Sequence, residues 1–268
     1  PRYLGSEGYG GIIAVIAASQ VAQVFLNWTY VSVVRFGVDE FIETEKIART
    51  FWIRLIFLAL NFLLILVLAG LWYPVLASWL KLPQWAMLFV IGHIAATSIW
   101  LHVQMSLQAA KMPRVQGALL TVERALILGG LLVLVATARF DLMAAMTCYI
   151  VAPAVMTIVG VFALRNYVFA RFPLDRAFFL KILAYSLPLF PTSLVGYFSG
   201  SYLDAIFVSR YLSTSDLGVY AVAMQISGIA LQIPTLANSL LTPLIITLEK
   251  EEQSNRMIRY MKDVLPSI

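Results

Sequence analysis

Residues 2–10 read RYLGSEGYG, and residues 210–218 read RYLSTSDLG. The Arg-Tyr-Leu start and the final glycine of the two strings align without a gap, and each string leads into a long apolar segment. The other apolar segments of the chain resemble one another only in composition. A motif that returns at this distance therefore indicates two tandem copies of a unit made of several helices.

The amino-acid composition predicts an integral membrane protein. Of the 268 residues, 61% are hydrophobic and only 12% are charged, and the mean hydropathy is +0.85. Soluble domains have about 45–50% apolar and about 25% charged residues, so this chain has too few charges to cover a core with a solvated surface. The net charge of +5 does not indicate nucleic-acid binding, because the basic residues sit in short connections between apolar segments.

Seven apolar segments are each long enough to cross a bilayer as a helix, which takes about 20 residues. The chain lacks the alternating segments of about ten residues that form a membrane barrel. The sequence therefore predicts an all-α membrane protein, with kinks at Pro188, Pro191 and Pro234. The segments lie at residues 10–34, 51–72, 85–108, 117–137, 142–164, 180–203 and 216–246.

The distribution of basic residues predicts the orientation in the membrane. Connections rich in lysine and arginine stay on the cytoplasmic side. Most of these residues lie at 35–54, 109–116, 165–181 and 249–268, whereas the alternate connections hold only Arg2, Lys81, Arg139 and Arg210. The first set of connections is therefore expected to be cytoplasmic.

The spacing of the repeated motif predicts the size of the complete unit. Six helix-length segments separate the two copies, so both copies point in the same direction, as in transporters built from two six-helix halves. The second copy is preceded by the segment at 180–203, and nothing precedes the first. We expect about twelve helices in the complete protein, of which this chain carries the second to the eighth. The expected divisions are an N-terminal lobe lacking its first helix at 1–165, a cytoplasmic linker between the lobes at 166–179, and the start of a C-terminal lobe at 180–268.

Patterns typical of catalysis or metal binding are weak in this sequence. No connection between helices is long enough for a sizeable extramembrane domain, which disfavours an enzyme. We interpret the acidic cluster at 39–45 as a solvated loop. It is flanked by basic residues, and no second carboxylate is spaced to form a pair for acid/base catalysis. His93 and His102 are more than two turns apart on one predicted helix and face different sides, so no metal site is expected.

Four stretches give the chain a resemblance to a known family. The strings at 2–10 and 209–223 resemble the starts of the second and eighth helices of bacterial polysaccharide flippases. QAAKM at 108–112 and YSLPLFP at 185–191 are similar to the same family. The resemblance covers nearly the whole chain, and it is to the O-antigen flippases of the multidrug/oligosaccharidyl-lipid/polysaccharide exporter superfamily.

This resemblance implies a MATE-like bundle of two lobes around a central cavity, in the inner membrane of a bacterium. It implies a flippase that moves an undecaprenyl-diphosphate-linked oligosaccharide to the periplasmic leaflet, for assembly of O-antigen, capsule or exopolysaccharide. The expected partners are the lipid-linked sugar, the bilayer, and a polysaccharide polymerase with its chain-length machinery. No cofactor is expected, although coupling to a proton or sodium gradient fits such a transporter. A drug/cation antiporter is the alternative, and a membrane sugar polymerase or ligase is less favoured.

Cationic side chains are needed for the diphosphate of such a cargo, and arginine binds phosphate through two hydrogen bonds. The candidates are Arg35, Arg54 and Arg124. Arg124 is expected to be the deepest, in a helix that begins near Gly117. The alternative for all three is a side chain that reaches out to the lipid head groups.

Polar residues of the first and last apolar segments are candidates for contacts with sugars. Hydrogen bonds between helices are the alternative for these residues, which are Gln20, Asn27, Gln225 and Asn238. Near the outer end of the segment at 180–203, Asp204 and Arg210 are candidates for gating or ion coupling. A solvated pair at the rim is the alternative for those two residues.

Overall fold

The computed structural model of the protein describes residues 5–171, 175–198, 201–228 and 242. Within these residues every regular element is a helix, as the sequence predicts. In chain order the elements are α1 (Gly5–Asn27), α2 (Tyr30–Thr44), α3 (Ala48–Val67), α4 (Ala69–Leu80), α5 (Ala86–Ala109), α6 (Pro113–Ala136), α7 (Leu142–Val168), α8 (Arg176–Ser186), the 3-10 turn η1 (Leu187–Leu189), α9 (Phe190–Phe198) and α10 (Ser201–Tyr211). A further helix occupies residues 214–228.

Six stretches of helix in the described residues are long and apolar enough to cross a membrane. They confirm six of the seven predicted segments. The seventh, predicted at 216–246, begins in the helix at 214–228, and almost all of its remainder, with Pro234 and Asn238, lies outside the described residues. The six stretches are Gly5–Asn27, Ala48–Val67, Ala86–Ala109, Pro113–Ala136, Leu142–Val168 and Arg176–Tyr197.

The first predicted segment, 10–34, is divided in the structure. α1 ends at Asn27, and α2 begins at Tyr30 after a short turn in which the Ser32 hydroxyl donates to the Thr29 carbonyl at 2.6 Å. The stretch after residue 35, interpreted as a connection because of its charges, is helical as far as Thr44. Part of this connection is therefore a helix, which is amphipathic and buries an apolar face against the bundle.

The start of α6 also differs from the prediction. The helix begins at Pro113 rather than near Gly117, because proline has no backbone N–H to lose in the first turn and its φ angle suits a helix. Arg124 is consequently about one turn further into its helix than the sequence predicts.

The α-helix is interrupted at Pro188, where the sequence predicts a kink. α8 ends at Ser186, the three residues of η1 form a 3-10 turn, and α9 continues from Phe190. Proline cannot donate the hydrogen bond that an α-helix requires, so the regular α-helix is interrupted here.

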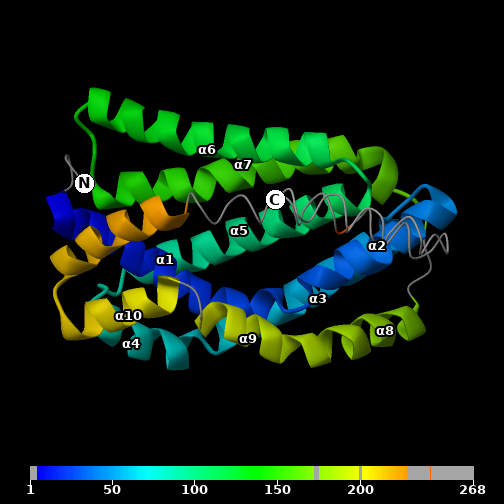
Figure 1. Cartoon of the computed structure of the whole chain (residues 1–268), viewed down its shortest axis with the longest axis horizontal. Coiled ribbons are helices and arrows are strands. Elements are labelled where there is room, and N and C mark those ends of the chain that lie inside the picture. Colours follow the sequence, from blue (N-terminus) through cyan, green and yellow to red (C-terminus); the bar gives the residue numbers. More distant parts are fainter. Residues whose placement is uncertain (1–4, 172–174, 199–200, 229–241, 243–268) are drawn as a thin grey trace, which may run out of the picture.

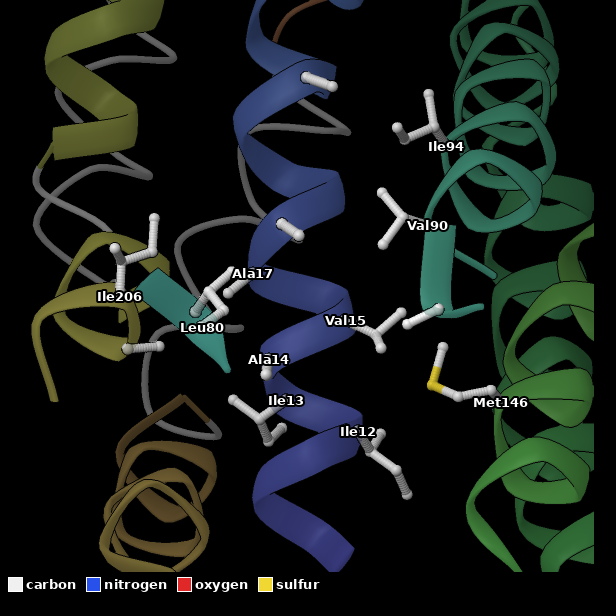
Figure 2. Close-up of a cluster of buried hydrophobic side chains, with 14 of the residues drawn as sticks. Ile12, Ile13, Ala14, Val15, Ala17, Leu80, Val90, Ile94, Met146 and Ile206 are labelled. Atoms are coloured by element: carbon white, nitrogen blue, oxygen red, sulfur yellow. The ribbon is translucent and has the colours of Figure 1, made fainter. Parts of the chain in front are cut away.

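α1 lies at the centre of the bundle. In Figure 1, α6 and α7 lie along one side of it and α8 to α10 along the other, with α5 beside it. Figure 2 shows that α1 buries two faces, because Val15 points toward Val90 and Met146, whereas Ala17 lies by Leu80 and Ile206. Small side chains on a helix allow close approach of its neighbours. This packing makes α1 the element that connects the two sides of the structure.

Two of the basic connections, at 35–54 and 165–181, lie together at one end of the described bundle. The backbone N–H of Ile47 donates to the carbonyl of Tyr167 at 3.1 Å. The Nζ of Lys46 donates to the carbonyl of Asn166 at 2.9 Å, and the indole N–H of Trp52 to the carbonyl of Val168 at 2.9 Å. The clustering of these connections at one end agrees with the alternation predicted from the sequence. We call this end the basic end and the opposite one the outer end.

Candidate functional site

A ladder of polar side chains joins α1 to α5 inside the bundle. The members on α1 are spaced four residues apart, which places them on one face of the helix. Three hydrogen bonds form the rungs: Ser19 Oγ to His93 Nδ1 at 2.6 Å, Gln23 Nε2 to Thr97 Oγ1 at 2.7 Å, and Asn27 Nδ2 to Ser98 Oγ at 3.0 Å. Polar groups in an apolar interior need such partners, so the ladder fixes the rotation of α1 relative to α5.

Arg54 extends this ladder to α3. Its side chain is 1% exposed, and its Nη2 donates to Asn27 Oδ1 at 3.3 Å. The Nε and Nη1 atoms are buried and have no hydrogen-bond partner. Burying a guanidinium costs several kcal/mol unless an acceptor compensates for the lost water. Arg54 is therefore a buried cation with free donors, and its chemistry suits an anionic ligand.

His102 lies next to Arg54 in the same region. Its ring packs on the ring of Phe51, with 4.5 Å between the centroids. Neither ring nitrogen meets the geometry of a hydrogen bond. From the sequence, His102 is weighed only as a metal ligand, and no metal site is expected there. The structure instead places it near the Arg54 side chain and against Phe51.

An apolar cavity of about 180 Å³ adjoins this region. It shares Ser98 with the ladder, and two of its lining residues, Leu26 and Leu55, are the chain neighbours of Asn27 and Arg54. The other lining residues are Leu58, Ala59, Phe62, Ala95 and Ile99. The cavity therefore borders the ladder at Ser98, while Arg54 itself does not line it.

The other predicted cations lie elsewhere. Arg35 is half-buried on α2. Arg124 is exposed on α6, where its neighbours Val122 and Leu126 are exposed as well. Exposed apolar neighbours are typical of a helix face that meets lipid. Arg54 meets another predicted site residue, Asn27, in a hydrogen bond.

The predicted sugar-binding residues are also dispersed. Gln20 is half-buried on α1, and Gln225 is exposed on the helix at 214–228. Asn27 is buried and bonded to both Ser98 and Arg54, and Asn238 lies outside the described residues. Asn27 thus has the role of positioning other polar side chains.

Asp204 and Arg210 have separate partners at the outer end. The Tyr220 hydroxyl donates to Asp204 Oδ2 at 2.8 Å. The guanidinium of Arg210 lies over the ring of Trp79, 5.7 Å from its centroid. Both side chains are exposed.

A buried carboxylate on α6 was missed by the sequence analysis. Glu123 is 5% exposed, and its Oε2 accepts a hydrogen bond from the indole N–H of Trp100 at 2.9 Å. The position of Trp100 in an apolar segment could have indicated a buried acceptor nearby, because a buried indole N–H needs one. Among the described residues no three His, Cys, Asp or Glu side chains gather where they could hold a metal ion.

Replacing Trp100 by phenylalanine is expected to destabilise the protein by about 1–3 kcal/mol, because the Glu123 carboxylate loses its donor while it remains buried. Thermal unfolding in detergent measures the change. The double variant Trp100→Phe/Glu123→Leu is the matched control, because it removes both partners and should be more stable than the single variant. Equal stability of the single and double variants would contradict the role of this bond.

The comparisons with known proteins complete the description of the site. The sequence profile of a family described as "Polysaccharide biosynthesis protein" matches residues 1–249. Neither the comparison with curated proteins nor that with solved structures gave a significant match.

Proposed function

We propose, because the chain belongs to the polysaccharide biosynthesis protein family, that it is a flippase for a lipid-linked oligosaccharide. In this proposal the cargo is an oligosaccharide on undecaprenyl diphosphate, and it moves from the cytoplasmic to the periplasmic leaflet of a bacterial inner membrane. The family and the six membrane-length helices support a membrane transporter connected with polysaccharide synthesis in general. The choice of cargo rests on the chemistry of the site.

Arg54 is the observation that carries this choice. A diphosphate brings negative charge and several acceptor oxygens, and moving these groups through hydrocarbon without partners costs many kcal/mol. Arg54 offers a charge and two buried nitrogens without partners, and the cavity that borders the ladder at Ser98 is lined mainly by aliphatic and aromatic carbon. A buried cation and apolar space in one ladder region fit a head group joined to a polyprenyl chain.

The remaining polar residues have supporting roles in this proposal. Asn27 holds the guanidinium of Arg54. Gln20 on α1 and Gln225 on the helix at 214–228 would serve the sugars, while the lobes rock about the site to expose it to each side in turn. A proton or sodium gradient would drive the cycle without a bound cofactor. The product would then pass to the polymerase and chain-length machinery on the outer side.

A buried arginine disfavours the drug/cation antiporter. A cationic drug would meet the like charge of Arg54 in a medium of low dielectric constant, where repulsion is strong. The site therefore suits an anionic cargo better than a cationic one.

Deleting the gene for the full-length protein tests the proposed function. We expect lipid-linked sugar units to accumulate on the cytoplasmic leaflet and the surface polysaccharide to be lost, because the head group cannot cross the bilayer unaided. Labelling of intact cells and inverted vesicles with a sugar-binding lectin measures both pools. Normal surface polysaccharide together with altered drug tolerance would overturn the flippase and support the antiporter.

A further inference from the structure

The two copies of the repeated motif touch each other at the outer end of the bundle. Gly10 and Gly218 occupy equivalent positions in the repeat, as do Ser6 and Thr214. A β-carbon added to Gly10 would overlap the carbonyl oxygen of Thr214, and one added to Gly218 would overlap the carbonyl oxygen of Ser6. The contact is thus reciprocal, which is the property of a two-fold related interface.

Glycine is required at both positions for a steric reason. The atom that opposes each missing side chain is a backbone oxygen, and backbone cannot move aside as a flexible side chain can. Neighbouring Gly11 differs, because a β-carbon there would meet only the end of the Leu142 side chain at 3.4 Å. Close helix crossings of this kind are held by packing between backbones.

Polar contacts accompany the glycine crossing. The hydroxyl oxygens of Ser6 and Ser215 are 2.5 Å apart. Lys81, at the end of α4, donates from Nζ to the carbonyl of Leu212 at 2.6 Å. Leu217 is fully buried in the core cluster that also contains Tyr9. These contacts join residues before 82 to residues after 205. They therefore hold the two copies of the repeat together.

The start of the second copy is a well-defined helix end. The backbone N–H of Ser213 donates to Asp216 Oδ2 at 3.0 Å, and the backbone N–H of Asp216 donates to Ser213 Oγ at 3.1 Å. This reciprocal pattern is a capping box, which satisfies backbone groups at a helix start. The helix at 214–228 therefore presents the Thr214 carbonyl and Gly218 to α1 as one rigid unit.

We propose that the crossing of Gly10 and Gly218 is a self-complementary contact surface that closes the outer side of the transport path. The proposal rests on the proposed transport function. The crossing lies at the end that has few basic residues, where the cargo would leave. Packing, the hydroxyl pair of Ser6 and Ser215 and the bond from Lys81 to the Leu212 carbonyl contribute to it, and such contacts can break and re-form in each cycle. The two copies of the repeat separate here when the path opens outward.

A reversible disulfide tests this closure in the full-length protein. Ser6→Cys and Ser215→Cys are introduced after Cys148 and any other cysteine have been replaced by serine. Because the two hydroxyl oxygens are 2.5 Å apart, the sulfur atoms should come within bonding reach. Copper phenanthroline accepts the two electrons and the thiols release two protons. We expect oxidation to protect both thiols from a maleimide reagent and to reduce polysaccharide export to the level of the deletion strain.

The controls separate the contact from the function. Each single cysteine variant should export normally after oxidation, and dithiothreitol should restore export by the double variant. A double variant that does not cross-link, or that exports fully while cross-linked, overturns the closure. A third outcome is that the double variant cross-links but the unmodified chain does not restore export to the deletion strain. That result contradicts the flippase function and supports the contact between the repeats.

Alanine variants test the steric argument separately. Gly10→Ala should reduce cross-linking of the cysteine pair, because the added methyl group pushes the Thr214 carbonyl away. Gly11→Ala is the matched control and should leave cross-linking unchanged, since Leu142 can shift its side chain. Protein level in the membrane is measured for both variants. Equal cross-linking of the two variants would contradict the requirement for glycine at residue 10.

Discussion

Replacing Arg54 by glutamine in the full-length protein is expected to reduce polysaccharide export roughly tenfold or more. A tenfold loss corresponds to about 1.4 kcal/mol in the binding free energy of the charged head group. Glutamine can still donate to Asn27, so the ladder between α1 and α3 is preserved in part. The positive charge and the free Nε and Nη1 donors are lost. Export is measured as surface polysaccharide in the deletion strain, at matched protein level.

Two further variants make the test of Arg54 specific. Arg54→Lys should give intermediate export, because lysine keeps the charge but lacks the planar fork that binds two phosphate oxygens. Arg124→Gln should export within about twofold of the unmodified protein, because that side chain is exposed beside exposed Val122 and Leu126. Full export by Arg54→Gln, or a greater loss in Arg124→Gln, would contradict the assignment of the cationic group to Arg54.

Replacing Glu40 by alanine is expected to lower the free energy of unfolding by about 3 kcal/mol, the cost of leaving buried donors without a charged acceptor. Glu40 is 6% exposed on α2. Its Oε1 accepts from the backbone N–H of Arg49 at 2.8 Å, and its Oε2 accepts from the backbone N–H and the hydroxyl of Thr50 at 2.8 and 2.7 Å. The carboxylate thus caps the first turn of α3, where N–H groups have no partner within the helix.

Thr50→Val is the matched control for Glu40. It removes one donor to the same carboxylate and keeps the shape of the side chain, so the expected loss is about 1 kcal/mol. Thermal unfolding of the purified protein in detergent measures both variants. If Thr50→Val destabilises the protein as much as Glu40→Ala does, the backbone bonds of the cap contribute little and the prediction is wrong.

Glu40 shows why part of the structure could not be predicted from the sequence. The acidic cluster at 39–45 is predicted to be a solvated loop, and this prediction is wrong for Glu40, which is buried on α2. Charge density predicts exposure only when no neighbouring element supplies buried donors. The donors for Glu40 come from the start of the next helix, and the turn between α2 and α3 decides whether they can meet.

The sequence predicted which types of residue form the candidate site, but not how their side chains are arranged. The sequence pointed to Arg54 and Asn27 among other polar residues, but nothing in it showed that these two are hydrogen-bonded to each other. It favoured Arg124 by depth, and the structure places Arg124 on an exposed face. It missed the bond between Trp100 and Glu123, whose partners lie on neighbouring helices.

The sequence by itself determined that the protein is an all-α membrane protein, where most of the spans lie, and that the helical segment predicted at 180–203 is interrupted at Pro188. These features are local consequences of chain chemistry, because backbone groups in lipid must bond within their own helix and proline cannot donate such a bond. Only the tertiary structure decided which side chains face each other. One residue turns a helix by about 100°, and the rotation of each helix is set by distant contacts such as Gly10 with Thr214 and Gly218 with Ser6, which no local pattern encodes.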